Sequence, residues 1–78
     1  MPTILFVNGY RFFFYSNEHL PAHIHVESTG RTAKFNLGVV ELVKSSGFNS
    51  KELKEIRTIV EENKNIFNIK WNEYFDNK

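Results

Sequence analysis

The sequence predicts an α+β fold. An antiparallel β-meander of four to five strands is followed by one long C-terminal amphipathic helix, or by two short ones, packed on the sheet. Two observations predict this class. The first half is rich in aromatic and β-branched residues and is divided by turn signals, as expected for short strands. The second half carries apolar residues at helical spacing. Strands first and helix last are typical of a sheet covered on one face.

Turn signals set the predicted strand limits. Asn8-Gly9 is a strong two-residue hairpin signal, because both positions tolerate positive φ. Ser28-Thr29-Gly30 marks a second turn, residues 16–21 form a polar loop, and Gly38 interrupts the pattern. The predicted strands are residues 3–7, 10–15, 22–27, 31–37 and, as the fifth, 39–44, with a loop at 45–47.

The predicted helix runs from about residue 50 to about residue 75. Asn49 or Ser50 can cap its first turn, and if Asn49 is the cap, Glu52 lies at the position that completes a variant of the capping box. Asn63 lies in the weakest stretch, because asparagine is a poor helix former, so a break into two shorter helices is the alternative. The apolar stripe comprises Leu53, Ile56, Val60, Phe67 and Tyr74, widened by Ile59, Ile66 and Trp71.

Length and composition limit the function classes. The 78 residues are expected to form one domain, residues 1–78, whose eight Phe residues supply most of a small core. A formal net charge of +1 gives no general attraction to nucleic acid. The sequence has no cysteine, so disulfide and thiolate chemistry are excluded. It shows no signal peptide and no long apolar run, so the expected location is the cytoplasm, away from membranes. The composition fits a monomer, a homo-oligomer or a complex equally well.

Strand alternation predicts which side chains share a face. In the second, third and fourth strands the predicted core sets are Tyr10, Phe12 and Phe14, then Ala22, Ile24 and Val26, then Ala33, Phe35 and Leu37. If these strands pair as hairpins, one allowed register sets Arg11 opposite Glu27, Phe13 opposite His25 and Tyr15 opposite His23, and a similar register of the next hairpin sets Lys34 opposite His25. The predicted outer patch therefore comprises Arg11, Tyr15, His23, His25, Glu27 and Lys34.

This patch contains the residue types needed for phosphodiester cleavage without a metal or cofactor. His23 and His25 lie roughly 6–7 Å apart along one strand face, and imidazoles titrate near neutral pH, so the pair can supply an acid and a base. Arg11 and Lys34 are candidate phosphate ligands. Tyr15 can donate a hydrogen bond, and Glu27 can orient a histidine or pair with Arg11.

Three other interpretations stay open. Histidines on a solvated strand face need no function. The patch, with the outward-facing Phe13, could instead bind a protein partner. A metal site is the third, because His23, His25 and Glu27 offer zinc-ligand chemistry and His19 could add an imidazole, although the nearby cations oppose a dication.

The sequence also resembles the domain-of-unknown-function family 4160 along its whole length. The resemblance is carried by Pro2-Thr3-Ile4-Leu5, residues 9–16, Pro21-x-His23-x-His25-Val26-Glu27, Ala33-Lys34-Phe35, Gly47-Phe48, Glu52-Leu53-x-x-Ile56, residues 59–63 and residues 71–75. Its motif includes Arg11, His23, His25, Glu27 and Lys34. The loop at 17–20 is expected to vary, so His19 receives no role.

The resemblance implies a small prokaryotic protein encoded beside a second small protein, in an arrangement like a toxin–antitoxin pair. The leading hypothesis is therefore an RNA-cleaving or otherwise phosphate-directed toxin with an antitoxin-like partner. A non-enzymatic domain that binds the neighbouring gene product is the alternative, and a metal-binding module is the third hypothesis.

Overall fold

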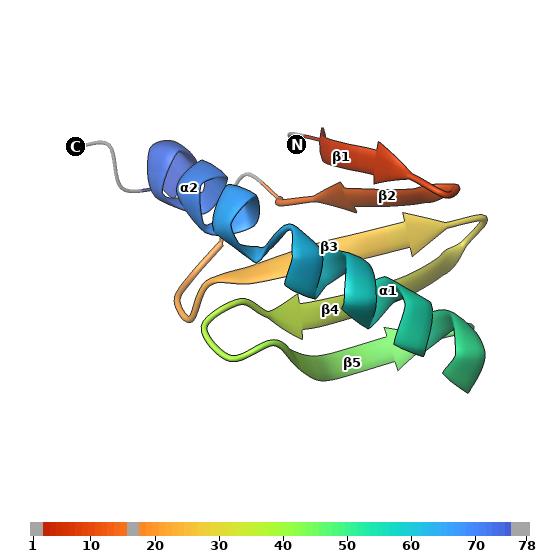
Figure 1. The fold of residues 1–78 in the computed structure, drawn as a ribbon. Helices are drawn as coiled ribbons and strands as arrows, with labels where there is room; N and C mark the ends of the chain where they lie inside the picture. Colours follow the sequence, from red (N-terminus) through yellow and green to blue (C-terminus); the bar gives the residue numbers. More distant parts are fainter. Residues whose placement is uncertain (1–2, 16–17, 76–78) are drawn as a thin grey trace.

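The computed structural model describes residues 3–15 and 18–75, which form five strands followed by two helices (Figure 1). The elements are β1 (Thr3–Val7), β2 (Tyr10–Phe13), β3 (His23–Ser28), β4 (Arg31–Asn36), β5 (Glu41–Ser46), α1 (Ser50–Glu62) and α2 (Lys64–Phe75). The predicted α+β class is confirmed, and the C-terminal region adopts the two-helix alternative. Residues 16 and 17 of the predicted loop lie outside the described part of the chain.

The strands form one antiparallel sheet in chain order, so the predicted meander is also confirmed. Asn8 and Gly9 have φ values of 54° and 81°, which is the left-handed pair that a tight hairpin needs. The predicted register is found at three pairs: Arg11 opposite Glu27, Phe13 opposite His25, and Lys34 opposite His25.

Strands β3 and β4 differ from the predicted limits by one residue, and β2 and β5 differ by two. Strand β2 ends at Phe13, so Tyr15 has no strand partner and the predicted Tyr15–His23 pairing is wrong. Strand β5 begins at Glu41, two residues later than predicted, because residues 37–40 form the turn after β4. Pairing of Asn36 with Glu41 closes that turn. The later start carries the strand through Ser46, which the sequence placed in a loop.

The helix boundaries follow from two asparagines. The Asn49 side chain accepts a hydrogen bond from Glu52 N at 2.8 Å, and Asn49 N donates to the Glu52 carboxylate at 2.9 Å, which confirms the capping box. Asn63 separates α1 from α2, and its amide Nδ2 donates to the Ile59 carbonyl at 2.8 Å. A side-chain amide that bonds the preceding turn competes with the helical backbone pattern there.

Both helices cover one face of the sheet, and the core lies between the helices and the sheet (Figure 1). Phe12 stacks on Phe67 with ring centroids 5.6 Å apart, and Phe14 meets Trp71 edge to face at 5.2 Å. The core side chains from the helices are Ile56, Ile59, Val60, Phe67 and Trp71. Of the other members of the predicted stripe, Leu53 is partly buried and packs against this core, whereas Ile66 and Tyr74 lie about half exposed on α2.

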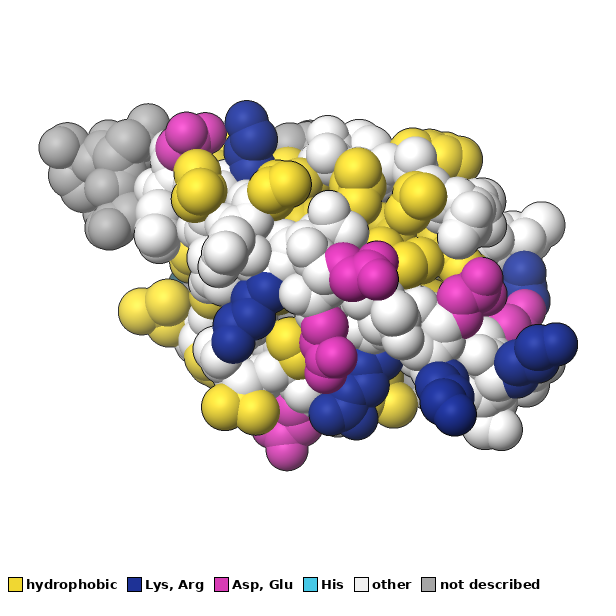
Figure 2. All heavy atoms as spheres, viewed as in Figure 1, with side chains coloured by type: hydrophobic (Ala, Val, Ile, Leu, Met, Phe, Trp, Pro, Cys, Tyr) yellow, Lys and Arg dark blue, Asp and Glu magenta, His cyan; other side chains and the backbone are white. Residues whose placement is uncertain are grey.

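The helix-covered face carries mixed charges along α1, and none of the described histidines is visible there (Figure 2). The candidate residues must therefore be sought on the opposite face of the sheet. None of the helices in the described part is long and apolar enough to cross a membrane.

Candidate functional site

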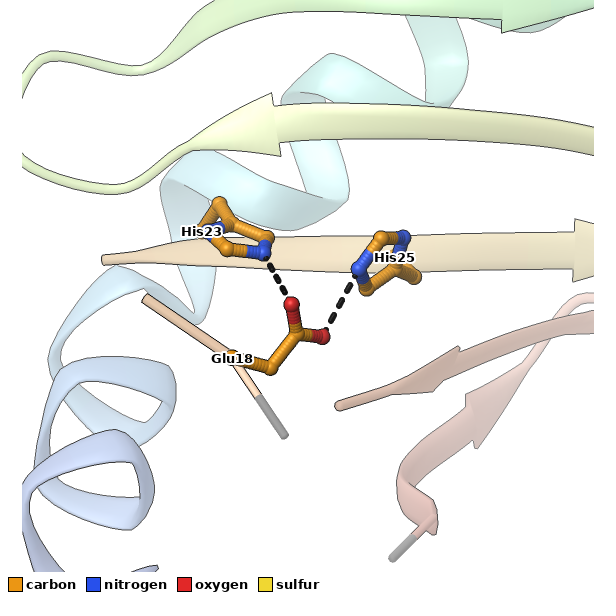
Figure 3. A group of neighbouring side chains, drawn as sticks. All are labelled: Glu18, His23 and His25. Atoms are coloured by element: carbon orange, nitrogen blue, oxygen red, sulfur yellow. Dashed lines mark hydrogen bonds and ion pairs between the residues drawn. The ribbon is translucent and has the colours of Figure 1, made fainter. Parts of the chain in front are cut away.

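Glu18, His23 and His25 form a cluster on the sheet face opposite the helices (Figure 3). Glu18 belongs to the loop before β3, and its carboxylate reaches both histidines of that strand. Oε1 of Glu18 lies 2.7 Å from Nε2 of His23, and Oε2 lies 2.8 Å from Nε2 of His25. Only 9% of the Glu18 side chain is exposed, so this carboxylate is an internal bridge and not a surface charge.

His23 is buried, which excludes for this residue the interpretation of a histidine on a solvated strand face. Its ring lies 5.0 Å from the Trp71 ring and is 4% exposed, because α2 packs against the end of β3. Nδ1 of His23 donates to the Pro21 carbonyl at 2.8 Å. A carbonyl oxygen can only accept, so Nδ1 carries the proton, and the ring is held with Nε2 facing Glu18.

The His25 ring packs against two aromatic side chains, Phe13 and Tyr15. Its ring stacks on the Phe13 ring with centroids 5.5 Å apart and meets the Tyr15 ring edge to face with centroids 4.6 Å apart. These contacts explain why Phe13, although it faces away from the helices, is only 3% exposed: Tyr15, His25 and the Arg11 guanidinium cover it. Phe13 is therefore a core residue of the second face and not the outward platform that strand alternation allowed.

Nε2 of His25 is buried, and among the described residues it has no hydrogen-bond partner with proper alignment. The Glu18 oxygen is near enough, at 2.8 Å, but does not lie in line with it. Burial lowers the pKa of His25, as do the neighbouring His23 and Lys34, and Glu18 offsets this only in part. His25 is therefore neutral at physiological pH.

Glu18 remains ionised for the opposite reason. Burial by itself would raise the pKa of this carboxyl. The hydrogen bond from Tyr15 N and the contacts with His23 and His25 outweigh burial and hold the pKa below its ordinary value. The cluster therefore contains one buried negative charge between two imidazoles.

These shifts predict that acid destabilises the fold. The unfolded chain protonates His25 near pH 6.5 and Glu18 near 4.5, whereas the folded chain protonates both only at lower pH. Below pH 6.5 the unfolded state thus binds more protons, and the free energy of unfolding falls. Urea unfolding followed between about pH 7 and 5 should show a smaller decrease for His25→Asn than for the wild type. His19→Asn, at an exposed position, is the control, and equal decreases in all three proteins would contradict the assignment.

A pocket of about 260 Å³ opens beside the cluster, and its lining includes Tyr15, His25, Lys34 and Lys44. Lys34 and Lys44 are direct partners across β4 and β5. In residues 3–15 and 18–75, neither lysine has a carboxylate within ion-pair distance. Like charges directly opposite one another destabilise a sheet, and an anion between them would remove that cost.

The remaining predicted residues lie on this face but outside the pocket. The Arg11 guanidinium pairs with Glu27 at 2.9 Å, donates to Thr3 Oγ1 at 2.9 Å and covers the Phe13 ring at 4.3 Å. Of the two roles expected for Glu27, it takes the pairing with Arg11. Arg11 and Glu27 thus neutralise each other next to the site.

Sequence reasoning missed Glu18 and Lys44. Glu18 lies in the loop that was expected to vary, and the available signal was a carboxylate five positions before His23 and followed closely by a proline. Lys44 was missed because its place in β5 depends on the length of the preceding turn. His19, considered as an additional ligand, is exposed and does not belong to the cluster.

A larger cavity of about 370 Å³ between β1 and α2 is a weaker candidate for an anion-binding site. The described residues that line it are Thr3, Ile4, Lys70, Glu73 and Tyr74, and the one cation among them is already paired, because Lys70 lies 3.7 Å from Glu73. The smaller pocket beside His25 is therefore the better candidate for an anionic ligand.

Comparison with known proteins identifies a family but no activity. A family model described as Domain of unknown function (DUF4160) matches residues 9–72. The search of curated proteins finds no match, and neither does the search of solved structures.

Proposed function

The chain belongs to the DUF4160 family, which carries no assigned activity, so its function has to be argued from its own side chains. We propose that it is a phosphate-directed, RNA-cleaving toxin of a two-gene toxin–antitoxin-like module. One observation carries the proposal. Lys34 and Lys44 face each other across two strands, without a described carboxylate partner, in a pocket that also contains His25. Two such lysines suit a phosphate group, and a histidine beside a bound phosphate suits cleavage of its ester.

The pocket residues have distinct proposed roles. Lys34 and Lys44 bind the phosphate and stabilise the charge that develops on it. His25 exchanges the proton, since it is neutral at physiological pH and can accept one. Tyr15, which is 48% exposed, donates a hydrogen bond to the substrate.

Glu18 and His23 act behind the pocket. Glu18 contacts Nε2 of His25, whose ring is held between Phe13 and Tyr15, and His23 holds Glu18 through its own anchored imidazole. His23 is too deeply buried to touch a substrate, so we assign it a positioning role. No metal or cofactor is needed for this chemistry. The two-gene setting and the antitoxin-like partner rest on the family resemblance and not on the pocket.

The proposal predicts growth arrest that depends on the two lysines and His25. Induced expression of the wild type should stop growth, whereas His25→Ala and the double variant Lys34→Ala/Lys44→Ala should grow normally. The matched control is Lys51→Ala/Lys54→Ala, which removes the same charge from exposed positions of α1 and should still arrest growth. Circular dichroism of each purified protein establishes that it is folded.

A binding measurement separates phosphate contact from a general loss of function. The affinity for a short single-stranded RNA should fall with salt, and Lys34→Ala/Lys44→Ala should reduce the slope of log K against log salt by about 1. An unchanged slope, or normal growth on expression of the folded wild type without any partner, would overturn the proposal.

A second candidate function is favoured by the open edge of the sheet. Among the described strands β5 pairs with β4 alone, all six of its residues are exposed, and Leu42 and Val43 are 40% and 47% exposed. An open strand of this kind can accept a strand from another chain. Equal growth of the wild type and the lysine variant would favour such a partner-binding domain over the toxin.

A further inference from the structure

The cluster of Glu18, His23 and His25 is built from three groups that commonly bind transition metals. Two imidazoles and a carboxylate match the donor set of several zinc sites. Their donor atoms all lie within 4.8 Å of one another, where donors around a tetrahedral zinc ion lie ~3.3 Å apart for bonds of about 2.0–2.1 Å. The three side chains converge from a strand and its preceding loop, as Figure 3 shows.

The protons of His23 support a cation at this place. Nδ1 carries a proton, because it donates to the Pro21 carbonyl. In the neutral ring Nε2 then presents a lone pair to the Glu18 carboxylate only 2.7 Å away, so two acceptors face each other. A positive charge shared by both, either a second proton or a metal ion, removes this conflict. Metal-bound histidines characteristically donate their other N–H to a backbone carbonyl or a carboxylate, as His23 does here.

His25 supplies an independent observation. Its Nε2 is buried and lacks an aligned hydrogen-bond partner in the described part of the chain, although a Glu18 oxygen lies 2.8 Å away. A buried nitrogen in this state is destabilising unless a further atom satisfies it. An ion bound by Glu18 and His23 would satisfy it.

We propose that Glu18, His23 and His25 bind a borderline transition-metal dication of the zinc class through the carboxylate and the two Nε2 atoms. Zinc suits two imidazoles and one carboxylate better than Ca²⁺ or Mg²⁺, which prefer oxygen ligands. The charge of Glu18 favours the ion, and Lys34, opposite His25, opposes it. Arg11 contributes little repulsion, because Glu27 neutralises it.

The metal inference does not rest on the proposed RNA cleavage, since ion binding is measured without RNA. It does constrain that function. A metal ion on Nε2 of His25 occupies the lone pair of the neutral ring, so the metal-bound cluster cannot accept a proton there. Metal binding and acid–base chemistry at His25 are alternative states of one cluster, and zinc should suppress any cleavage that depends on His25.

Calorimetric titration of the chelator-treated full chain with zinc chloride tests the site. We expect one ion per chain and a zinc-dependent rise in the melting temperature. Glu18→Gln and His25→Asn should each weaken zinc binding at least tenfold, and His23→Ala should abolish it. His19→Ala is the matched control, because it removes an exposed neighbouring histidine and should bind zinc like the wild type.

Loss of the metal site can be distinguished from loss of the fold and from zinc binding elsewhere on the surface. His23 packs on Trp71, so His23→Ala could lose its fold, and the decisive variants are therefore Glu18→Gln and His25→Asn. Zinc binding by these two at wild-type affinity while folded, or no zinc binding by the wild type, overturns the inference. Loss of binding in His19→Ala would also overturn it, because the ion would then be held by a different set of ligands.

Discussion

Replacing Phe12 with alanine should leave the protein largely unfolded at room temperature. Phe12 of β2 is fully buried under the helices and stacks on Phe67 of α2. Removing such a ring costs about 3–5 kcal/mol through lost burial and the cavity left behind. A core of this size usually supplies only about 3–5 kcal/mol of net stability, so the two quantities nearly cancel.

Phe6→Ala is the matched control for this prediction. It makes the same chemical change in the neighbouring strand β1, where the ring is 68% exposed. Urea unfolding followed by circular dichroism should place Phe6→Ala near the wild type and show no cooperative transition for Phe12→Ala. If both variants unfold at similar urea concentrations, contacts between the sheet and α2 do not dominate stability.

The sheet could be predicted because its determinants are local. Alternation of polar and apolar side chains fixed the two faces, and any one-residue slip would have buried a charged set. Asn8-Gly9 then fixed the first turn, since both residues take positive φ. These rules were sufficient for the pairs of Arg11 with Glu27 and Lys34 with His25. They predicted which residues share the second face.

The contents of the site could not be predicted in the same way, because they depend on contacts distant in the sequence. Nothing local shows that Trp71 packs on His23 and excludes solvent from it. Loop conformation alone brings Glu18 over the strand, and strand alternation does not apply to a loop. The two histidines of the predicted outer patch thus belong to a largely buried cluster beside an open pocket.

That buried cluster should also matter for stability, and Glu18→Ala should lower the free energy of unfolding by about 2–3 kcal/mol. The change removes the acceptor of the hydrogen bond from Tyr15 N and the partner of the buried His23 Nε2, at roughly 1–3 kcal/mol for each such group. Glu18→Gln keeps the shape and one acceptor oxygen, so it should lose less. Urea unfolding in the presence of a chelator measures both without a contribution from metal.

The control for Glu18 is Glu61→Ala, which removes a carboxylate of the same charge from a helix surface. Glu61 pairs with Arg57 at 3.3 Å, but both side chains are more than half exposed, and such pairs contribute about 0–1 kcal/mol. A Glu18→Ala loss no larger than that of Glu61→Ala would mean that the bridge adds nothing net. In that case the burial cost of the carboxylate cancels its contacts, and the cluster is retained for its chemistry and not for the fold.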